Sequence, residues 1–474
     1  MRIRGMGSEA NDLRSIPSVD RLINDLAPTF VPRPLVVCLA RAVLGDMRSE
    51  GVIPPYEEAV RRLEAEVKRL ERMRLQRLVN ATGIPLHTNL GRAPLAASVG
   101  TQVGDIARGY SNLEFDLGTG KRGRRGDYAE RCLAQLTGAS GVAVVNNCAA
   151  ALILILNQAV RSGRSEVVIS RGEMVQIGGG FRIPDILASS GARMREVGTT
   201  NRTTVADYEA AIGEETGMIL VVHRSNFFME GFVASPELRE LVRLGERSGI
   251  PVVYDQGSGS LVDTGRYPGV PHERTVSEAI DQGASLVCFS GDKLFGGPQA
   301  GIVAGNKEEI NALKKNPLFR ALRCDKLVLC ALQATAEAYL RMSSDKASDG
   351  AVPVHEMLSE SVESLRRRAE ALCSANVPRE WQLAVADTVI EVGGGTLPQS
   401  RVPSVAVTVR SRVVPGPQIA RAFREASMPI IGYVTNGAFH LDLRTVDPRD
   451  DEVIIQELKI LIQSQRQSGE GLGE

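Results

Sequence analysis

The sequence lacks any run of about 18 apolar residues, the length that a membrane-spanning helix requires. Its N-terminus, MRIRGMGSEANDLRSIPSVDRL, carries charges but no apolar segment of the kind found in signal peptides. Seven cysteines are present, an odd number without a Cys-x-x-Cys pair, so neither a disulfide framework nor a structural zinc site is indicated. These absences predict a cytoplasmic protein with no membrane segment and no bound metal.

The chain also lacks a net charge and a nucleotide-binding motif. Its 56 basic and 56 acidic residues cancel, so a surface for an anionic partner must be local. No Gly-x-x-x-x-Gly-Lys-Ser/Thr sequence occurs, which argues against nucleotide hydrolysis. Apolar residues, in contrast, are abundant. They make up 43% of 474 residues, which is enough to form the cores of two or three domains.

Three parts follow one another along the chain. Residues 1–78 are predicted to form a helical domain and linker, because helix-start signals occur near residues 18, 33 and 55. Residues 79–340 alternate apolar strands with helices, which predicts an α/β fold with a mostly parallel sheet covered by helices. Its clearest strands are residues 142–145, 166–169, 217–222, 251–254 and 284–289. Residues 341–474 are predicted to form a smaller α+β domain, with helices at 359–373 and 451–463 and strands at 404–409 and 438–443.

The third predicted helix of the first part, residues 56–78, combines an apolar face with many basic side chains. The basic residues are Arg61, Arg62, Lys68, Arg69, Arg72, Arg74 and Arg77. Five glutamates on the same helix neutralise part of this charge. Two interpretations stay open at this point, a solvated helix with internal ion pairs and a surface that faces nucleic acid.

Lys293 is the candidate catalytic residue. It follows the strand at 284–289 and lies in the Gly-rich sequence SGDKLFGGPQAG, residues 290–301. A lysine amine held by packing in such a place, with a lowered pKa, can attack a carbonyl. Asp255 follows the strand at 251–254, and its carboxylate can hold a pyridinium nitrogen protonated. Together the two residues predict pyridoxal 5'-phosphate (PLP) as the cofactor, with Lys293 as its Schiff-base lysine.

Two further segments are predicted to bind PLP. Asn147, Cys148 and Ala149 lie between the strand at 142–145 and a helix at 152–161, where small residues let backbone N–H groups approach a phosphate. Asn226 follows the strand at 217–222, and its amide either donates to the phenolic oxygen of the cofactor or caps a turn. The nearby His223 is interpreted as a satisfied, partly buried imidazole.

Arginine-rich segments indicate an anionic second substrate. Arg92 ends the segment at residues 80–92, and Arg320 and Arg323 lie close together in the sequence RALRCDK. A guanidinium binds a phosphate-like anion through two parallel hydrogen bonds, although surface ion pairing is the alternative for each residue. The basic turn KRGRRG, residues 121–126, is another candidate and could equally be a solvated loop or a subunit contact.

Six motifs together resemble those of the bacterial selenocysteine synthases, the L-seryl-tRNA(Sec) selenium transferases. They are NATGIPLHTNLGR at 80–92, YSNLE at 110–114, SRGE at 170–173, GFRIPD at 180–185, SGDKLFGGPQAG at 290–301 and RALRCDK at 320–326. The resemblance spans nearly the whole chain. It implies a fold-type I PLP enzyme that assembles as a homodecamer and whose N-terminal domain holds selenocysteine tRNA charged with serine. It also implies that Arg92, Arg320 and Arg323 hold selenophosphate.

The reaction that this resemblance implies converts L-seryl-tRNA(Sec) to L-selenocysteinyl-tRNA(Sec) through an aldimine and an aminoacrylate on PLP. Lys293 is the natural base for the α-proton, and Asp292 beside it either assists the selenium step or makes only a local hydrogen bond. Three positions depart from the family pattern. This chain has Gln176 where we expect an acidic residue in the family, Cys148 where we expect asparagine, and Tyr433 where we expect arginine.

Two other functions are compatible with parts of the sequence. A PLP-dependent lyase acting on a small phosphorylated amino sugar or amino acid would use the same core, but such a substrate gives no reason for a basic N-terminal domain. A non-catalytic tRNA-binding protein would share the fold, but it would not need an intact Lys293 and Asp255.

Overall fold

A computed structural model of the chain describes residues 17–50, 55–177, 180–344 and 352–470. The chain divides into two compact units, Met1–Leu78 and Val79–Glu474, which are treated separately below. The boundary predicted at residue 340 falls inside helix α13 (Lys326–Ser344), so the division between the second and third parts stays a prediction. Among the described residues, no helix has the length and apolar composition needed to cross a bilayer.

The first unit consists of three helices, α1 (Val19–Asn24), α2 (Arg33–Glu50) and α3 (Tyr56–Arg72). Its core includes the buried side chains of Leu22, Leu44 and Leu63. Helix α3 ends at Arg72 and does not continue to residue 78 as predicted. Leu75 is fully exposed, so the residues beyond Arg72 lack the packing that stabilises a helix in water.

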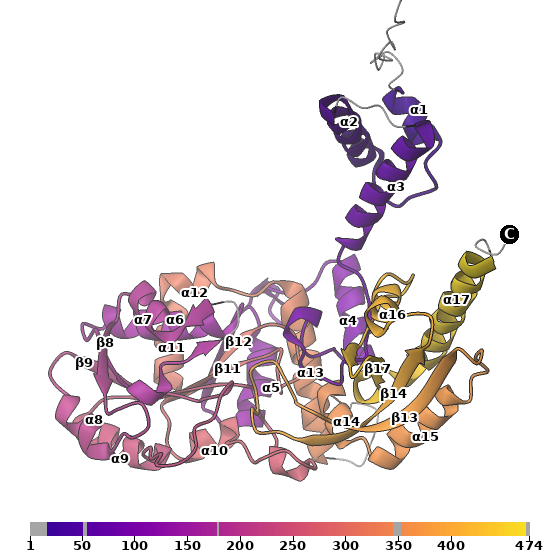
Figure 1. The fold of residues 1–474 in the computed structure, drawn as a ribbon. Coiled ribbons are helices and arrows are strands. Elements are labelled where there is room, and N and C mark those ends of the chain that lie inside the picture. Colours follow the sequence, from indigo (N-terminus) through magenta and orange to yellow (C-terminus); the bar gives the residue numbers. More distant parts are fainter. Residues whose placement is uncertain (1–16, 51–54, 178–179, 345–351, 471–474) are drawn as a thin grey trace, which may run out of the picture. The chain divides into compact units, whose positions relative to one another are not determined.

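The second unit is built around a seven-stranded sheet with the strand order β4-β12-β11-β10-β9-β5-β8 (Figure 1). The strands are β4 (Gly141–Val145), β5 (Glu166–Ser170), β8 (Arg193–Val197), β9 (Thr216–Val222), β10 (Val252–Gly257), β11 (Leu286–Ser290) and β12 (Gly301–Gly305). Neighbouring strands are parallel from β11 to β8, whereas β12 runs antiparallel to both β11 and β4. The five strands predicted from apolar runs are all present in this sheet.

Helices cover both faces of this sheet, because successive residues of its strands are buried on opposite sides. Val167 and Ile169 belong to one core and Val168 to the other. On one face lie α6 (Cys148–Arg161), α7 (Ile183–Ser190), α11 (Lys307–Lys315) and α12 (Pro317–Ala321), and on the other α8 (Val205–Ala211), α9 (Leu238–Ser248) and α10 (Val276–Asp281) (Figure 1). The predicted α/β fold is confirmed.

The C-terminal part of the second unit contains an antiparallel sheet with the order β13-β14-β17-β16. Its strands are β13 (Trp381–Ile390), β14 (Val402–Ser411), β16 (Tyr433–Thr435) and β17 (Ala438–Asp442), and its helices are α14 (Pro353–Ser359), α15 (Val362–Cys373), α16 (Gly416–Arg424) and α17 (Asp451–Glu470). Strand β1 (Val79–Asn80) pairs in parallel with β15 (Ile430–Ile431), an association of the start of the unit with its C-terminal part that the sequence did not predict.

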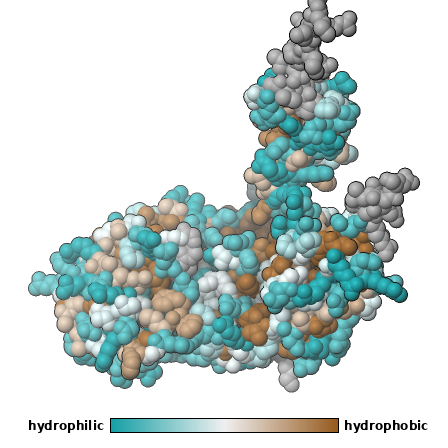
Figure 2. Space-filling view, in the orientation of Figure 1, coloured by the Kyte–Doolittle hydropathy of each residue, from teal (hydrophilic) through white to brown (hydrophobic). Residues whose placement is uncertain are grey.

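Short elements and a long helix complete the second unit. They are α4 (Ala97–Arg108), β2 (Phe115–Asp116), β3 (Lys121–Arg122), α5 (Asp127–Thr137), β6 (Gln176–Ile177), β7 (Phe181–Arg182) and α13. Several apolar side chains of this unit are exposed. In its C-terminal part these include Val389, Val413, Val434 and Ile460. Figure 2 shows hydrophobic residues at the surface near α16 and α17.

Candidate active site

The central sheet brings the predicted PLP residues to one edge. Asp255 lies in β10, Lys293 follows β11, and Asn226 follows β9. Because these neighbouring strands are parallel, their carboxyl ends lie at the same edge, where α/β proteins bind ligands. The His223 N–H donates to the Asp255 carbonyl oxygen at 2.8 Å, which ties the residues after β9 to β10.

Lys293 is buried in a tight turn, with 6% of its surface exposed. Within the described residues its amine makes no hydrogen bond or ion pair, and burial lowers its pKa. The turn is held against the neighbouring loop by the Leu294 N–H, which donates to the Ser258 carbonyl oxygen at 2.9 Å. Gly259 has a φ of 75°, and a Cβ there would lie 2.4 Å from the Ser290 carbonyl oxygen, so this approach requires glycine. The amine is therefore held in place, and its lowered pKa favours the neutral form that attacks a carbonyl.

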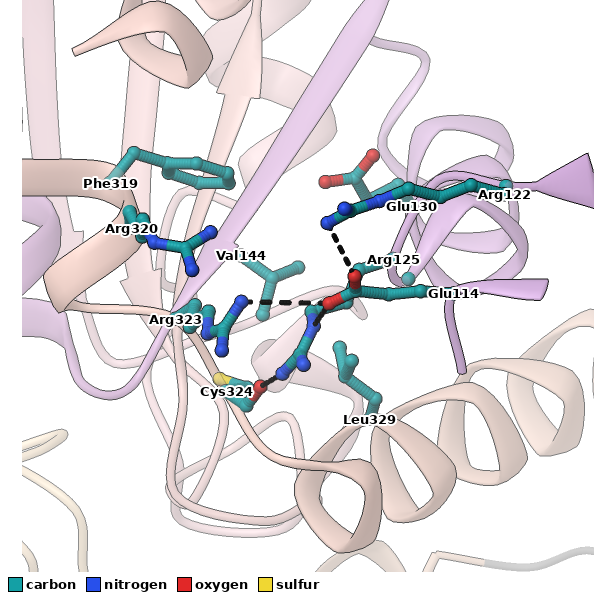
Figure 3. Close-up of a pocket in the computed structure, with 12 residues that line it drawn as sticks. Glu114, Arg122, Arg125, Glu130, Val144, Phe319, Arg320, Arg323, Cys324 and Leu329 are labelled. Carbon is teal, nitrogen blue, oxygen red and sulfur yellow. Dashed lines mark hydrogen bonds and ion pairs between the residues drawn. The ribbon is translucent and has the colours of Figure 1, made fainter. Parts of the chain in front are cut away.

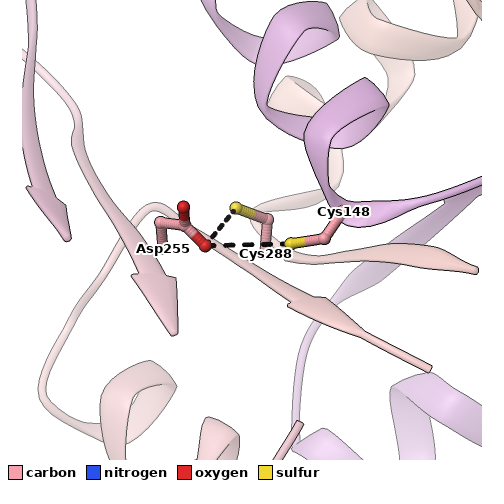
Figure 4. A group of neighbouring side chains, drawn as sticks. All are labelled: Cys148, Asp255 and Cys288. Atoms are coloured by element: carbon pink, nitrogen blue, oxygen red, sulfur yellow. Dashed lines mark hydrogen bonds between the residues drawn. The ribbon is translucent and has the colours of Figure 1, made fainter. Parts of the chain in front are cut away.

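Asp255 is buried next to two thiols. The Sγ atoms of Cys288 and Cys148 donate to its Oδ1 at 3.5 and 3.8 Å (Figure 4). Burial raises the pKa of Asp255, whereas the hydrogen bond from Cys288 and the charge of Lys293 lower it. A buried carboxylate with one oxygen held in this way suits a cationic partner such as a pyridinium nitrogen.

The start of α6 has the features of a phosphate-binding helix end. Asn147 caps the helix by accepting from the Ala150 N–H at 2.8 Å, so the helix begins at Cys148, four residues before the predicted start. The first N–H groups of a helix, here those of Cys148 and Ala149, have no partner inside the helix and can approach a phosphate. The Cys148 side chain points instead toward Asp255.

Asn226 lies where a bound ligand would complete its hydrogen bonds. Its Nδ2 donates to the Gln176 carbonyl oxygen at 2.7 Å, while its Oδ1 is buried without a hydrogen-bond partner. A buried amide oxygen normally has a partner. The buried amine of Lys293, the buried carboxylate of Asp255 and the second N–H of the Asn226 amide fit PLP, and the roles of these residues toward it stay predictions.

Arg92 and Asp292 form an ion pair beside Lys293. The Arg92 guanidinium lies 2.7 Å from the Asp292 carboxylate, which also accepts from the Ser290 hydroxyl at 2.8 Å. Asp292 is buried, while Arg92 keeps 29% of its side chain exposed. The pair therefore presents a partly accessible guanidinium next to the candidate catalytic lysine.

Arg320 and Arg323 line a cavity of about 210 Å³ together with Arg122 and Arg125 of the basic turn (Figure 3). Arg92 is not among the residues that line it. The Asn146 N–H donates to the Leu322 carbonyl oxygen at 2.9 Å, which ties the segment between the two arginines to the loop that precedes α6. The structure thus brings the basic turn and the RALRCDK segment together, next to the predicted phosphate site.

Glu114 is a charged residue of this cavity that the sequence analysis did not single out as functional. Its carboxylate accepts from Arg122 and Arg125 at 2.8 Å each and lies 3.5 Å from the Arg323 guanidinium (Figure 3). The hydrogen bond from Arg125 lowers the pKa of Glu114. Its place in the YSNLE motif was a signal, but its partners lie 8 to 209 positions away along the chain, so the cluster was not predictable.

The remaining singled-out residues have structural partners. His223 lies 3.4 Å from Glu273, in agreement with its interpretation as a satisfied, partly buried imidazole. Gln176 accepts from Arg182 at 2.7 Å, and the Tyr433 ring stacks on His440. One further cluster of thiol and carboxylate groups lies in the described residues. It consists of Cys148, Asp255 and Cys288, whose Sγ and carboxylate oxygen atoms lie within 4.8 Å of one another.

Comparison with known proteins was made at the level of sequence and of structure. The family model of the L-seryl-tRNA selenium transferases matches residues 78–447. The chain is 43% identical over 460 residues to the L-seryl-tRNA(Sec) selenium transferase of Geobacter sulfurreducens, covering 94% of this chain and 98% of that protein. It is 40% identical over 455 residues to the protein of the same name from Aquifex aeolicus, covering 95% and 99%.

Among solved structures, a D-glucosaminate-6-phosphate ammonia-lyase shares the fold, with a TM-score of 0.56 and 19% identity over 84% of this chain and 98% of that one. At this level of identity the likeness concerns the fold alone.

Proposed function

The chain belongs to the L-seryl-tRNA selenium transferase family, and we propose that it converts L-seryl-tRNA(Sec) to L-selenocysteinyl-tRNA(Sec) with selenophosphate as the selenium donor. It is a PLP-dependent enzyme of fold-type I. The observation that supports catalysis most directly is the buried amine of Lys293, which makes no hydrogen bond or ion pair within the described residues and lies at the sheet edge where Asp255 is also found.

PLP would be held by groups from four segments. Lys293 would bind its carbonyl carbon, Asp255 its ring nitrogen and Asn226 its phenolic oxygen, while the start of α6, with Asn147, Cys148 and Ala149, would hold its phosphate. When bound, PLP supplies a conjugated ring that takes up the electron pair left on the α-carbon.

The chain's own residues then move protons and orient the substrates. Lys293 would remove the α-proton of the seryl group, a role favoured because burial lowers the pKa of its amine. Asp255 would keep the ring nitrogen of the cofactor protonated. Asp292 orients the Arg92 guanidinium through their ion pair.

Selenophosphate would be bound by Arg92, Arg320 and Arg323. Arg320 and Arg323 line a cavity with two further arginines, and guanidinium groups bind a tetrahedral oxyanion through paired hydrogen bonds. Arg92 belongs to a different part of the site, beside Lys293. The proposed selenophosphate site therefore has two parts, the arginine-lined cavity and the guanidinium beside Lys293.

The tRNA would be held by the N-terminal unit, residues 1–78. Helix α3 has five basic residues and five glutamates, and its Arg61, Arg62 and Arg69 form ion pairs with glutamates. Several apolar side chains of this unit are nevertheless exposed, among them Phe30, Met73 and Leu75. Basic and apolar side chains together suit phosphate contact and stacking on bases.

A homo-oligomer, by resemblance a decamer, is the proposed assembly, working in the cytoplasm. The second unit exposes Tyr110, Phe115, Leu117 and Tyr128 close together in the sequence, around the basic turn. Clustered exposed apolar side chains mark interfaces between proteins. The same segment lines the arginine cavity, so an interface here would lie beside the proposed selenophosphate site.

Neither alternative function is favoured. Relatives about 40% identical over the full chain length are selenium transferases, whereas the ammonia-lyase shares only the fold. A non-catalytic role would leave the buried amine of Lys293 without a purpose.

The test is turnover of seryl-tRNA(Sec) with selenophosphate by the purified holoenzyme. We expect selenocysteinyl-tRNA from the wild type and none from Lys293→Ala, which should also lose the absorbance of lysine-bound PLP. Lys307→Ala, which removes an exposed lysine of α11, is the matched control and should behave as wild type. Turnover by the wild type with other small phosphorylated substrates, but not with seryl-tRNA, would contradict the proposal.

A further inference from the structure

Two cysteine thiols converge on one oxygen of Asp255. The Sγ of Cys288 lies 3.5 Å and that of Cys148 3.8 Å from Oδ1, and Figure 4 shows all three side chains directed toward one another. Cys288 is fully buried and Cys148 is half-buried. The mechanism outlined above uses neither thiol as a reactant.

The fold itself creates this convergence. Asp255 of β10 and Cys288 of β11 are direct partners in the parallel register, so their side chains point to the same face of the sheet. Helix α6 packs on that face and begins at Cys148. The three groups therefore come from three elements whose relative positions are set by the packing of the sheet and α6.

In a hydrogen bond with an ionised carboxylate, a thiol must be the donor, because the carboxylate has no proton to donate. Each S–H group therefore stabilises the ionised form of Asp255 over its protonated form. The other titratable groups that face Asp255 are Lys293 and His223, and a positive charge on either of them also favours its ionised form. Burial acts in the opposite direction by raising the pKa of Asp255, so these partners act against the effect of burial.

We propose that Cys148 and Cys288 are positioning residues that keep Asp255 ionised, and thereby keep the ring nitrogen of PLP protonated. The inference rests on the proposed contact between Asp255 and that nitrogen. The two groups share one proton, and the proton stays on the nitrogen only while the carboxylate is the weaker base. Removing a donor makes the carboxylate a stronger base, so the proton moves from the ring to Asp255.

Because S–H is a weak donor, we expect each thiol to shift this equilibrium by roughly threefold to tenfold. The direct readout is the NMR resonance of 15N-labelled PLP bound to the full-length protein, since the ring nitrogen resonates at different positions when protonated and unprotonated. Cys148→Ala and Cys288→Ala should each move the resonance toward the unprotonated position, and the double variant should move it further.

Two variants control for a merely structural effect. Cys330→Ala removes another buried thiol, which lies in α13 and belongs neither to the Asp255 contacts nor to the sheet, and it should leave the resonance unchanged. Cys148→Asn should restore the protonated position, because its amide nitrogen extends further from Cβ than Sγ does and can close the 3.8 Å separation. If the double variant does not fold, the resonance of Cys148→Ala alone tests the proposal. The Cys148 side chain is half-buried at a helix end, so we expect this single variant to fold.

The proposal is overturned if the double variant, with PLP bound, keeps the wild-type resonance, or if Cys330→Ala moves it equally. The resonance is read without tRNA or selenophosphate, so it does not depend on the proposed reaction. A wild type that shows a protonated nitrogen but no selenium transfer would refute the proposed function and leave this inference standing. In active enzyme, kcat should fall in the alanine variants while the KM for seryl-tRNA stays constant.

Discussion

The guanidinium of Arg92 lies 2.7 Å from the carboxylate of Asp292, the residue directly before Lys293. The two residues are 200 positions apart in the chain. Arg92 has a φ of 63°, a conformation that residues other than glycine rarely adopt and that clusters at functional sites. An anion that reaches Arg92 must therefore compete with a carboxylate that is already bound to it.

Replacing Asp292 by asparagine should tighten anion binding and slow turnover. The substitution removes a negative charge that competes with selenophosphate for Arg92, so we expect the KM for selenophosphate to fall about threefold or more. The lost ion pair also frees the guanidinium to adopt other orientations, so kcat should fall. Steady-state kinetics with varied selenophosphate measure both values, and a raised KM would show that the pair helps to form the anion site.

Arg320→Ala and Arg323→Ala should impair the selenium step more than the proton step. Each substitution removes a guanidinium from the cavity, so we expect the KM for selenophosphate to rise about tenfold or more. Release of tritium from the α-carbon of labelled seryl-tRNA should change little, because Lys293 is untouched. Arg247→Ala, in the exposed part of α9, is the control. Equal loss of both steps would mean that the two arginines bind something else.

Deleting residues 1–78 should remove tRNA binding and leave PLP in place. The division of the chain into two compact units falls at Leu78 and Val79, and the PLP residues all belong to the second unit. We expect the affinity for seryl-tRNA(Sec), measured by filter binding, to fall about a hundredfold while the cofactor absorbance persists. An unchanged affinity would assign tRNA binding to the second unit.

Glu173 should make the stability of the protein depend on pH. It is buried and accepts the Val222 N–H at 3.0 Å, and burial raises its pKa from 4.5 to about 7. Folding therefore favours its protonated form, and this stabilisation is fully present below about pH 4.5 and is lost as the pH rises through 7. The loss amounts to about 3 kcal/mol.

Glu173→Gln keeps an oxygen for the Val222 N–H but cannot ionise. Relative to wild type, its thermal midpoint should therefore rise between pH 5 and pH 8, as followed by differential scanning calorimetry. Glu215→Gln, at an exposed position, should give no such trend. A difference between Glu173→Gln and wild type that does not vary with pH would show that Glu173 is not protonated in the folded protein.

Much of the fold followed from local sequence pattern. The parallel strands were predictable because a strand buried on both faces reads as an uninterrupted apolar run. Strand β13 was not predictable, because its residues are a mixture of buried and partly exposed side chains. The pairing of β1 with β15 was not predictable either, because β1 has only two residues. Helix α3 is shorter than predicted. Its helical sequence pattern continues beyond Arg72, but the apolar side chain of Leu75 there is exposed and not packed.

The sequence by itself determined the chemistry of the site: an amine after one buried strand, a carboxylate at the end of another, and arginines in recognisable motifs. Strand ends and loop composition are local properties, so Lys293 and Asp255 could be named without a structure. Only the tertiary structure decided that Cys148 and Cys288 meet on Asp255, and that Glu114 joins Arg323. These contacts join residues 33 to 209 positions apart, and they depend on strand register and helix packing, which the whole chain establishes together.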